Sequence, residues 1–374
     1  MQKPAVWICA FALLHVPCAT AGGLHLGMKL ACKRYGDAWS AGDKPGVAAA
    51  CAEDFAGVWQ LMPDELFAKL PKPSAGEAEV LDSRKGLEEA EVEVKTGEGS
   101  VVFQLEGRGF QWLVADLRVR NEADESVSLK HSLAVSLAAR NFLAAMNDPA
   151  SRGFAACCSG EFRSKLARLD AGEWKLVKGY LPSMPEPAPT KRPMVRFHGR
   201  TAASMTTKSP TGDGEVALTF VNENGWRIHD LAMRGKGMLI PSFRDSLPAL
   251  AATAAMGKFL KAPKSLDPAA FVAPGKLLDE FTHLHKGSPP PPPACGDKPE
   301  HLRVSHDSRQ VYVKYPEKWV MVALDGAEEK SRIALVQLHQ GGKWQNASDL
   351  LALHRNVQSA GLGWLTQAGF KKAE

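Results

Sequence analysis

Two aspartates that follow a tryptophan near the end of an expected strand are the best candidates for chemistry in this chain. Asp116 comes four residues after Trp112, and Asp230 comes four residues after Trp226. Because strand residues alternate between faces, each aspartate is expected to share a face with its tryptophan. On a concave face, burial would raise the pKa of the carboxyl group and suit it to work as a base. The other interpretation is a structural carboxylate at a turn, and recurrence of the pattern favours it.

The pattern recurs a third time at Trp344 and Asp349, so the tryptophans are 114 and 118 residues apart. Each tryptophan closely follows a glycine turn, and we expect it to fill the same packing site against the helices of its segment. We predict neither catalytic residues, nor metal ligands, nor a cofactor. The predicted ligand-binding residues are Trp112, Asp116, Trp226, Asp230, Trp344 and Asp349.

Further landmarks recur at matching intervals and predict an internal repeat. Each segment has a first helical stretch that ends near an aspartate, and these stretches lie at 35–43, 140–148 and 256–267. A proline follows each aspartate closely, which is typical of the start of a second helix. A second helix then closes on an acidic residue and a phenylalanine, and a proline-rich connection follows it. The pairs are Asp54-Phe55, Glu161-Phe162 and Glu280-Phe281, and the connections lie at 71–73, 182–193 and 289–293.

Strand patterns follow the helices in each segment. Val92 and Val94 alternate with glutamates, which is typical of a half-buried strand, and short glycine or asparagine turns predict antiparallel hairpins. Helices followed by a meander predict an α+β fold. We therefore predict a signal peptide at 1–21, three tandem α+β units at 24–125, 129–236 and 246–355, and a tail at 356–374. Residues 126–128 and 235–246 are expected to be surface linkers or seams between units.

The units resemble the nuclear transport factor 2-like superfamily, the cone-shaped fold of SnoaL-like proteins. The residues that carry the resemblance are Tyr35, Ala38-Trp39, Ala41-Gly42-Asp43, Ala52-Glu53-Asp54-Phe55 and Gly225-Trp226. The resemblance implies that helices pack into a strongly curved antiparallel sheet and leave a cavity at its open end. The superfamily includes isomerases, dehydratases, ligand binders and structural modules, so the fold does not choose among these functions.

The N-terminus predicts export. Lys3 precedes an apolar stretch at 5–16, and Ala19 and Ala21 fit a signal peptidase site before Gly22. We expect a periplasmic, cell-envelope or extracellular protein with no membrane span after signal removal. An uncleaved N-terminal anchor is the alternative. The net charge of +5 is small for 374 residues and does not call for a nucleic acid.

The remaining reactive side chains give weaker signals. Two of the cysteines, Cys9 and Cys18, fall in the expected signal, and Cys32 and Cys51 could form a disulfide or be buried thiols. No zinc spacing, phosphate loop or serine-hydrolase elbow is present. The disulfide status of Cys157, Cys158 and Cys295 stays open. His229 and His306 are expected to be exposed, and His283, His285 and His301 give only a weak metal signal. A mild basic cluster is expected to be a solvated loop, and its residues are Lys191, Arg192, Arg196 and Arg200.

These patterns favour an exported, non-enzymatic binding or scaffold protein built of three cone-like modules. Its partner would be a small apolar ligand or another protein. The alternative is an isomerase, dehydratase or hydrolase that acts on a small apolar molecule in one cone. An enzyme should concentrate buried ionisable side chains in one unit, and the sequence shows no such concentration.

Overall fold

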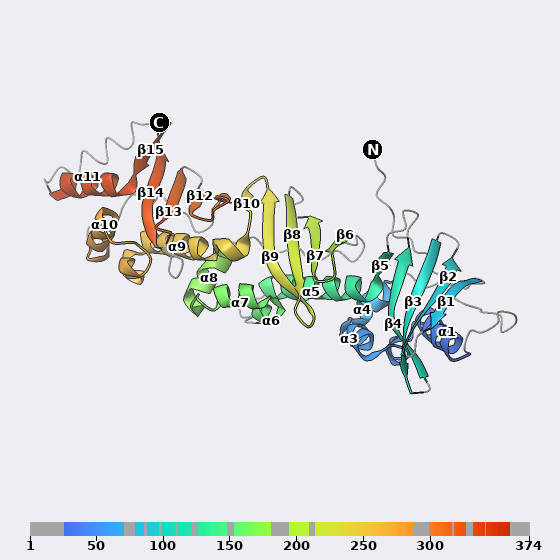
Figure 1. The fold of residues 1–374 in the computed structure, drawn as a ribbon. Coiled ribbons are helices and arrows are strands. Elements are labelled where there is room, and N and C mark those ends of the chain that lie inside the picture. Colours follow the sequence, from blue (N-terminus) through green and yellow to red (C-terminus); the bar gives the residue numbers. More distant parts are fainter. Residues whose placement is uncertain are drawn as a thin grey trace. The chain divides into compact units, whose positions relative to one another are not determined.

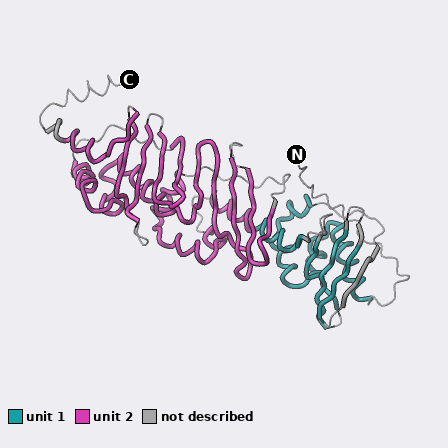
Figure 2. The backbone as a smooth tube through the Cα atoms, turned by 45° about the horizontal axis from the view of Figure 1, so that its top comes forward, with its two compact units in different colours: residues 1–137, 189–192 teal, residues 138–188, 193–374 magenta. Residues whose placement is uncertain are grey.

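The computed structural model describes residues 26–70, 79–85, 88–96, 99–109, 111–120, 126–147, 153–180, 194–208, 214–287, 299–315, 318–326, 332–340 and 342–359. The expected signal peptide, Cys295 and most of the C-terminal tail lie outside these ranges. The chain divides into two compact units, residues 1–137 with 189–192 and residues 138–188 with 193–374 (Figure 2). Both combine helices with sheets, which confirms the α+β class.

The first compact unit places four helices before a five-stranded antiparallel sheet with strand order β1-β2-β3-β4-β5 (Figure 1). The helices are α1 (Leu26–Ala41), α2 (Lys44–Ala49), α3 (Glu53–Leu61) and α4 (Asp64–Ala68). The strands are β1 (Glu79–Lys85), β2 (Glu89–Thr96), β3 (Gly99–Arg108), β4 (Gln111–Arg120) and β5 (Ser126–Ser128).

Aromatic rings from the helices and the sheet fill the core of this unit. Tyr35 lies 6.1 Å from Phe55, 6.3 Å from Trp59 and 6.2 Å from Phe103, measured between ring centroids. All four side chains are fully buried. Rings at these separations contribute favourable edge and offset contacts in addition to the burial of apolar area.

The second compact unit contains two successive sets of helices and strands, and the division between the compact units falls inside α5 (Leu129–Asn147). The first set continues with α6 (Phe154–Cys157), α7 (Gly160–Leu166), α8 (Ala171–Tyr180), β6 (Met194–His198), β7 (Ala202–Lys208), β8 (Gly214–Asn222), β9 (Trp226–Gly235) and β10 (Met238–Ile240). The next set has α9 (Phe243–Lys261), 3-10 turns at Pro263–Ser265 and Pro268–Ala270, α10 (Lys276–His285), β11 (His301–Val304), β12 (Gln310–Lys314), β13 (Trp319–Leu324), β14 (Ile333–Gln340), β15 (Lys343–Asn346) and α11 (Ala347–Ser359).

The strands of both sets form one ten-stranded sheet that runs from β6 to β15 (Figure 1). Strand β10 joins the two sets because it pairs antiparallel with β9 and parallel with β11. The sequence predicts only antiparallel pairs and a seam at 235–246, so the parallel pair is a departure. The expected linker at 126–128 is likewise a strand, β5, that pairs with β4.

The same backbone arrangement occurs three times. Each time, a residue in the helical layer forms an isolated parallel bridge to a residue of a sheet strand. The sheet strand has a bulge directly after its own bridged residue. A short strand and then a helix follow each time, namely β5 and α5, β10 and α9, and β15 and α11. The bridged pairs are Cys51 with Val114, Cys158 with Ile228, and Val272 with Ile333.

Of the predicted helix starts, Asp43 caps the α-helix α2, whereas Asp267 caps a three-residue 3-10 turn and α10 starts later, at Lys276. Asp43 accepts a hydrogen bond from the amide of Gly46 at 3.0 Å, and Asp267 accepts one from the amide of Ala269 at 3.0 Å. Asp148 lies outside the described residues. Such caps satisfy amides that have no partner inside the helix.

Val47, Cys51 and Phe55 recur at intervals of four residues, an apolar stripe typical of a single helix, but the structure does not form one helix here. Helix α2 ends at Ala49, and α3 begins at Glu53. Cys51 instead lies in extended backbone, because its neighbours Ala50 and Ala52 exchange hydrogen bonds with Val114 at 3.0 and 2.9 Å. All three side chains are nevertheless buried, so the stripe correctly identified core positions.

Candidate functional site

The bulges decide on which face of the sheet Asp116 and Asp230 lie. Val114 pairs with the buried Leu105, but Asp116 pairs with Gln104, so one extra residue separates the two pairs. Cross-strand partners share a face, and a bulge shifts the alternation by one residue. Asp116 therefore lies on the face opposite to Val114. The prediction that it shares a face with Val114 and Trp112 is wrong.

Asp230 shows the same displacement. Ile228 pairs with the buried Phe220, whereas Asp230 pairs with the exposed Thr219. The extra residue is His229. A sequence pattern of period two cannot include an inserted residue, so the alternation that placed both aspartates among core side chains fails at this point.

Both carboxylates accept a hydrogen bond from an amide at the start of the next helix. Asp116 Oδ1 accepts hydrogen bonds from the amides of Leu117 at 2.8 Å and Lys130 at 2.9 Å. Asp230 Oδ1 accepts hydrogen bonds from the amides of Leu231 at 2.7 Å and of Arg244, in the first turn of α9, at 2.9 Å. A carboxylate at a helix N-terminus satisfies unpaired amides and interacts favourably with the helix dipole. This geometry agrees with the structural interpretation of the two aspartates.

The third copy of the sequence pattern occupies a different place in the fold. The residue at the position of Asp116 and Asp230 is Leu335, which pairs with Ala323 beside the third bulge. Trp344 lies on β15, where it is 42 % exposed, and Asp349 lies in the first turn of α11. Asp349 forms an ion pair with Lys276 at 2.6 Å. The sequence alignment of the third tryptophan with the first two is therefore wrong.

The three tryptophans differ in burial. Trp226 is 8 % exposed, and its ring centroid is 5.7 Å from that of Phe197 on β6. Trp112 is half-buried and packs against the core of its unit, close enough to α1 that a Cβ on Gly27 would lie 3.2 Å from its ring. Trp226 is thus buried, but its ring contact is with a strand residue, whereas Trp112 lies beside a helix and Trp344 is exposed.

A polar cluster beside the second bulge resembles a catalytic arrangement in composition. Ser159 Oγ lies 3.4 Å from His229 Nδ1, and His229 Nε2 lies 2.7 Å from Arg244 Nη1. Because a guanidinium group can only donate, Nε2 must be the acceptor and Nδ1 must carry the proton. His229 therefore donates toward the serine and cannot remove its proton in this arrangement.

The other contacts of the cluster are structural. Ser159 is fully buried, and its hydroxyl accepts a hydrogen bond from the amide of Phe162 at the start of α7. Arg244 forms an ion pair with Glu161 at 2.9 Å, which connects the first turns of α7 and α9. The cluster therefore ties two helix N-termini together.

The four described cysteines are not bonded to one another, so the possible disulfide between Cys32 and Cys51 is not formed in this structure. Burial raises the pKa of the Cys32 thiol to about 12 and also raises the pKa of Cys51 and Cys158. A thiol that stays protonated is a poor nucleophile. Among the described residues, no group of three or more histidine, cysteine or acidic side chains could hold a metal ion.

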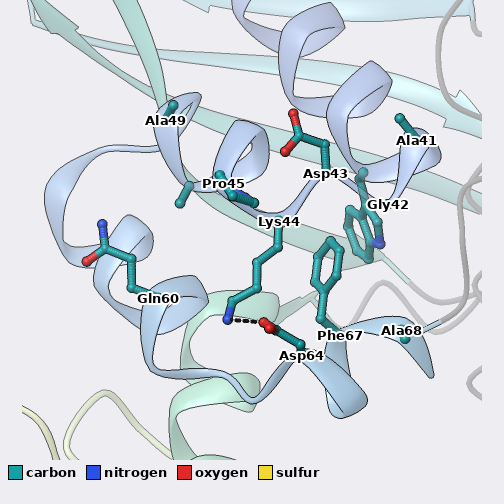
Figure 3. A pocket seen from close by; sticks show the side chains of 12 residues that line it. Ala41, Gly42, Asp43, Lys44, Pro45, Ala49, Gln60, Asp64, Phe67 and Ala68 are labelled. Carbon is teal, nitrogen blue, oxygen red and sulfur yellow. Dashed lines mark hydrogen bonds and ion pairs between the residues drawn. The ribbon is translucent and has the colours of Figure 1, made fainter.

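A groove among the helices of the first compact unit offers room for a small ligand. Its volume is about 930 Å³, within the usual range for ligand pockets. Its apolar walls include Trp39, Pro45 and Phe67, and an ion pair between Lys44 and Asp64, with a separation of 2.7 Å, joins α2 to α4. Figure 3 shows Lys44 and Asp64 pointing toward one another beside Phe67. The groove thus offers apolar surface next to a charged pair.

The sequence analysis did not identify this groove. Its residues come from the ends of four helices and the turns beside them, and no sequence spacing places those ends together. The available signals were Asp43 and Pro63, which mark the starts of α2 and α4.

No known protein family, curated protein or solved structure matches this chain. The resemblance to the cone-shaped superfamily therefore stays a prediction. In the described part of the chain, no helix is both long and apolar enough to cross a membrane.

Proposed function

We propose that this chain is an exported, non-enzymatic binding or scaffold protein made of three cone-like units in tandem. The three bridges, the three bulges and the three strand-to-helix connections support a common ancestor unit. The continuous sheet through β10 supports a scaffold in which the later units act as one body.

The non-enzymatic proposal rests on the hydrogen bonds of the candidate catalytic side chains. Asp116, Asp230 and Ser159 all accept hydrogen bonds from backbone amides at the starts of helices. A general base or nucleophile needs a free lone pair or proton directed toward substrate. These side chains instead satisfy amides that would otherwise be unpaired.

The groove of the first compact unit supports the binding role, and its exposed small residues permit a direct test. Ala49 lines the groove and is exposed, so Ala49→Trp should fill it with little effect on folding. We expect the wild-type chain to bind the fluorescent probe 1-anilinonaphthalene-8-sulfonate, whose rings suit the apolar walls and whose sulfonate suits Lys44. The variant should bind it about tenfold or more weakly.

Ala144→Trp is the matched control, because Ala144 is an exposed alanine of α5 outside the groove lining. It should bind the probe as the wild type does. Equal binding by the wild type and by both variants would contradict a ligand site in the groove. Far-ultraviolet circular dichroism on each variant checks that the fold is kept.

One observation favours an enzyme in the first unit as a second candidate. The hydroxyl of Tyr35 is fully buried and has no hydrogen-bond partner among the described residues. Burial, and after it the charges of Cys51 and Asp116, raise the pKa of Tyr35. A buried hydroxyl without a partner costs about 1–3 kcal/mol, and functional sites commonly carry such costs.

Tyr35→Phe tests this second candidate through the free energy of unfolding in urea. A gain of about 1–3 kcal/mol would mean that the hydroxyl is kept at the expense of stability, as in a reactive site. No gain would mean that the hydroxyl serves the fold and would remove the reason to expect an enzyme.

Export is tested by the N-terminus of the native protein. Because the apolar stretch and the small residues before Gly22 fit a cleaved signal, mass spectrometry should find a chain that starts at or near Gly22. Recovery of a chain that still begins with Met1 would contradict a cleaved signal.

A further inference from the structure

The three strand-to-helix connections indicate a new interaction surface. A bulged strand leads to a short strand and then to a helix in β4–β5–α5, β9–β10–α9 and β14–β15–α11. The inference rests on the proposed three-unit organisation, since it treats these connections as equivalent.

The second of these connections shows what its outer edge can bind. Strand β10 pairs with β9 on one side and accepts β11 in parallel on the other. The amide of Leu302 donates to the carbonyl of Gly237 at 2.8 Å. A Cβ on Gly237 would lie 2.9 Å from the carbonyl oxygen of Glu300, so the two sets approach to a distance that only glycine permits. The first strand of the following set therefore completes this edge.

In the part of the chain that the structure describes, no further strands follow the third connection. Strand β15 is the last strand of the ten-stranded sheet, and within the described ranges no strand pairs with its outer side. An edge strand presents unpaired amides and carbonyls and is a ready template for another strand.

Exposed apolar side chains accompany this free edge. Trp344 on β15 is 42 % exposed, and Leu353 on α11 is 61 % exposed. By contrast, no large apolar side chain is exposed among those described in β5 and α5. In the occupied connection, the corresponding helix α9 is mostly buried along its length and packs against β9 and β12. The third connection thus has the form of a docking surface without its partner.

We propose that β15 and α11 bind a second copy of this chain through the open edge of its β1. Strand β1 ends the five-stranded sheet, and no described strand pairs with its outer side. It would lie parallel to β15, as β11 lies parallel to β10. Because the two surfaces differ, the contact is heterologous and can continue from copy to copy. Apolar contacts from Trp344 and Leu353 would supplement the few hydrogen bonds that such short strands provide.

Sedimentation velocity of the full mature chain over a range of concentrations tests the proposal. The wild type should associate, and Leu353→Asp should weaken the association by about tenfold or more, as expected for a charge placed in a central apolar contact. Leu61→Asp is the control, because Leu61 is 77 % exposed at the end of α3 and lies on neither proposed surface. It should associate as the wild type does.

Hydrogen exchange identifies the two surfaces. Association should slow the exchange of amides in both β15 and β1. Protection of other segments without these two would overturn the proposed contact, and so would a wild-type chain that stays monomeric at all concentrations.

A chain that ends after Ser359 distinguishes a second copy from residues 360–374 as the occupant. If only this shortened chain associates, the segment 360–374 covers the surface and the proposal is wrong. Probe binding in the groove is measured separately, so a failure of association would leave the ligand-binding proposal intact.

Discussion

The connections β9–β10–α9 and β14–β15–α11 share one backbone plan but differ in the side chains that stabilise it. Both begin with a bulge directly after a bridged residue. In β9–β10–α9, Asp230 accepts a hydrogen bond from the amide of Arg244 in α9. In β14–β15–α11, the corresponding residue is Leu335. The bulge therefore does not require the carboxylate. The aspartate serves the helix that follows it, and α11 has a surface ion pair between Asp349 and Lys276 instead.

The largest expected difference between these regions is the loss of unfolding free energy when their tryptophans are replaced by alanine. Trp226→Ala should lower the free energy of unfolding by about 3–5 kcal/mol, the range for removing a buried aromatic ring. Trp344→Ala should lower it by about 1 kcal/mol or less, because much of the Trp344 ring is already in water. Urea unfolding followed by circular dichroism measures both values.

Equal losses in the two tryptophan variants would contradict the comparison and restore the view that both fill one shared packing site. If Trp226→Ala loses ligand binding but keeps its stability, the tryptophan belongs to a pocket and not to the core.

The next difference concerns the aspartates. Asp230→Ala should lower the free energy of unfolding by about 2–3 kcal/mol, because the amides of Leu231 and Arg244 lose a charged acceptor. Asp116→Ala should have a similar effect through Leu117 and Lys130. Asp349→Ala should leave the melting temperature unchanged, since its ion pair with Lys276 is exposed.

Substitution by asparagine separates the effect of the charge from the effect of the hydrogen bonds. Asp230→Asn keeps a side-chain oxygen acceptor and should recover part of the stability lost in the alanine variant. No recovery would mean that the charge, and not the hydrogen bonds, stabilises the start of α9.

A smaller effect than that of Asp230, and one that depends on pH, is expected from Asp245 in the first turn of α9. Burial raises the pKa of Asp245, but hydrogen bonds from Lys165 and Arg244 outweigh burial and lower it to about 2. A folded-state pKa below the unfolded value of about 3.9 stabilises the fold above that value. This stability is lost as the pH falls from about 4 to about 2.

Asp245→Asn should therefore cost about 1 kcal/mol at neutral pH, allowing for solvent screening of a partly exposed pair. The variant and the wild type should become equally stable below about pH 2, where the Asp245 carboxyl group is protonated in the folded protein as well. A difference that does not change with pH would mean that Asp245 acts through packing alone. The measurement is urea unfolding across this pH range.

Local patterns in the sequence correctly identified the elements that depend on near neighbours. The α+β class, the alternating strand β2, and the caps Asp43 and Asp267 all follow from periodicity and capping chemistry. Phe55, Phe162 and Phe281 are buried as their apolar spacing indicates. In each case the physical cause acts within a few residues, so it leaves a mark that the sequence alone displays.

Tertiary structure alone decided the features that depend on partners distant in the chain. The bulge after Ile228 turns Asp230 away from the core, and it depends on pairing with β8 and on the bridge to Cys158. The parallel pairing of β10 with β11 joins residues that are far apart in the sequence. The groove likewise depends on the packing of four helix ends. A one-residue insertion in a strand, a sheet edge and a cavity have no period of their own, so no spacing in the sequence could reveal them.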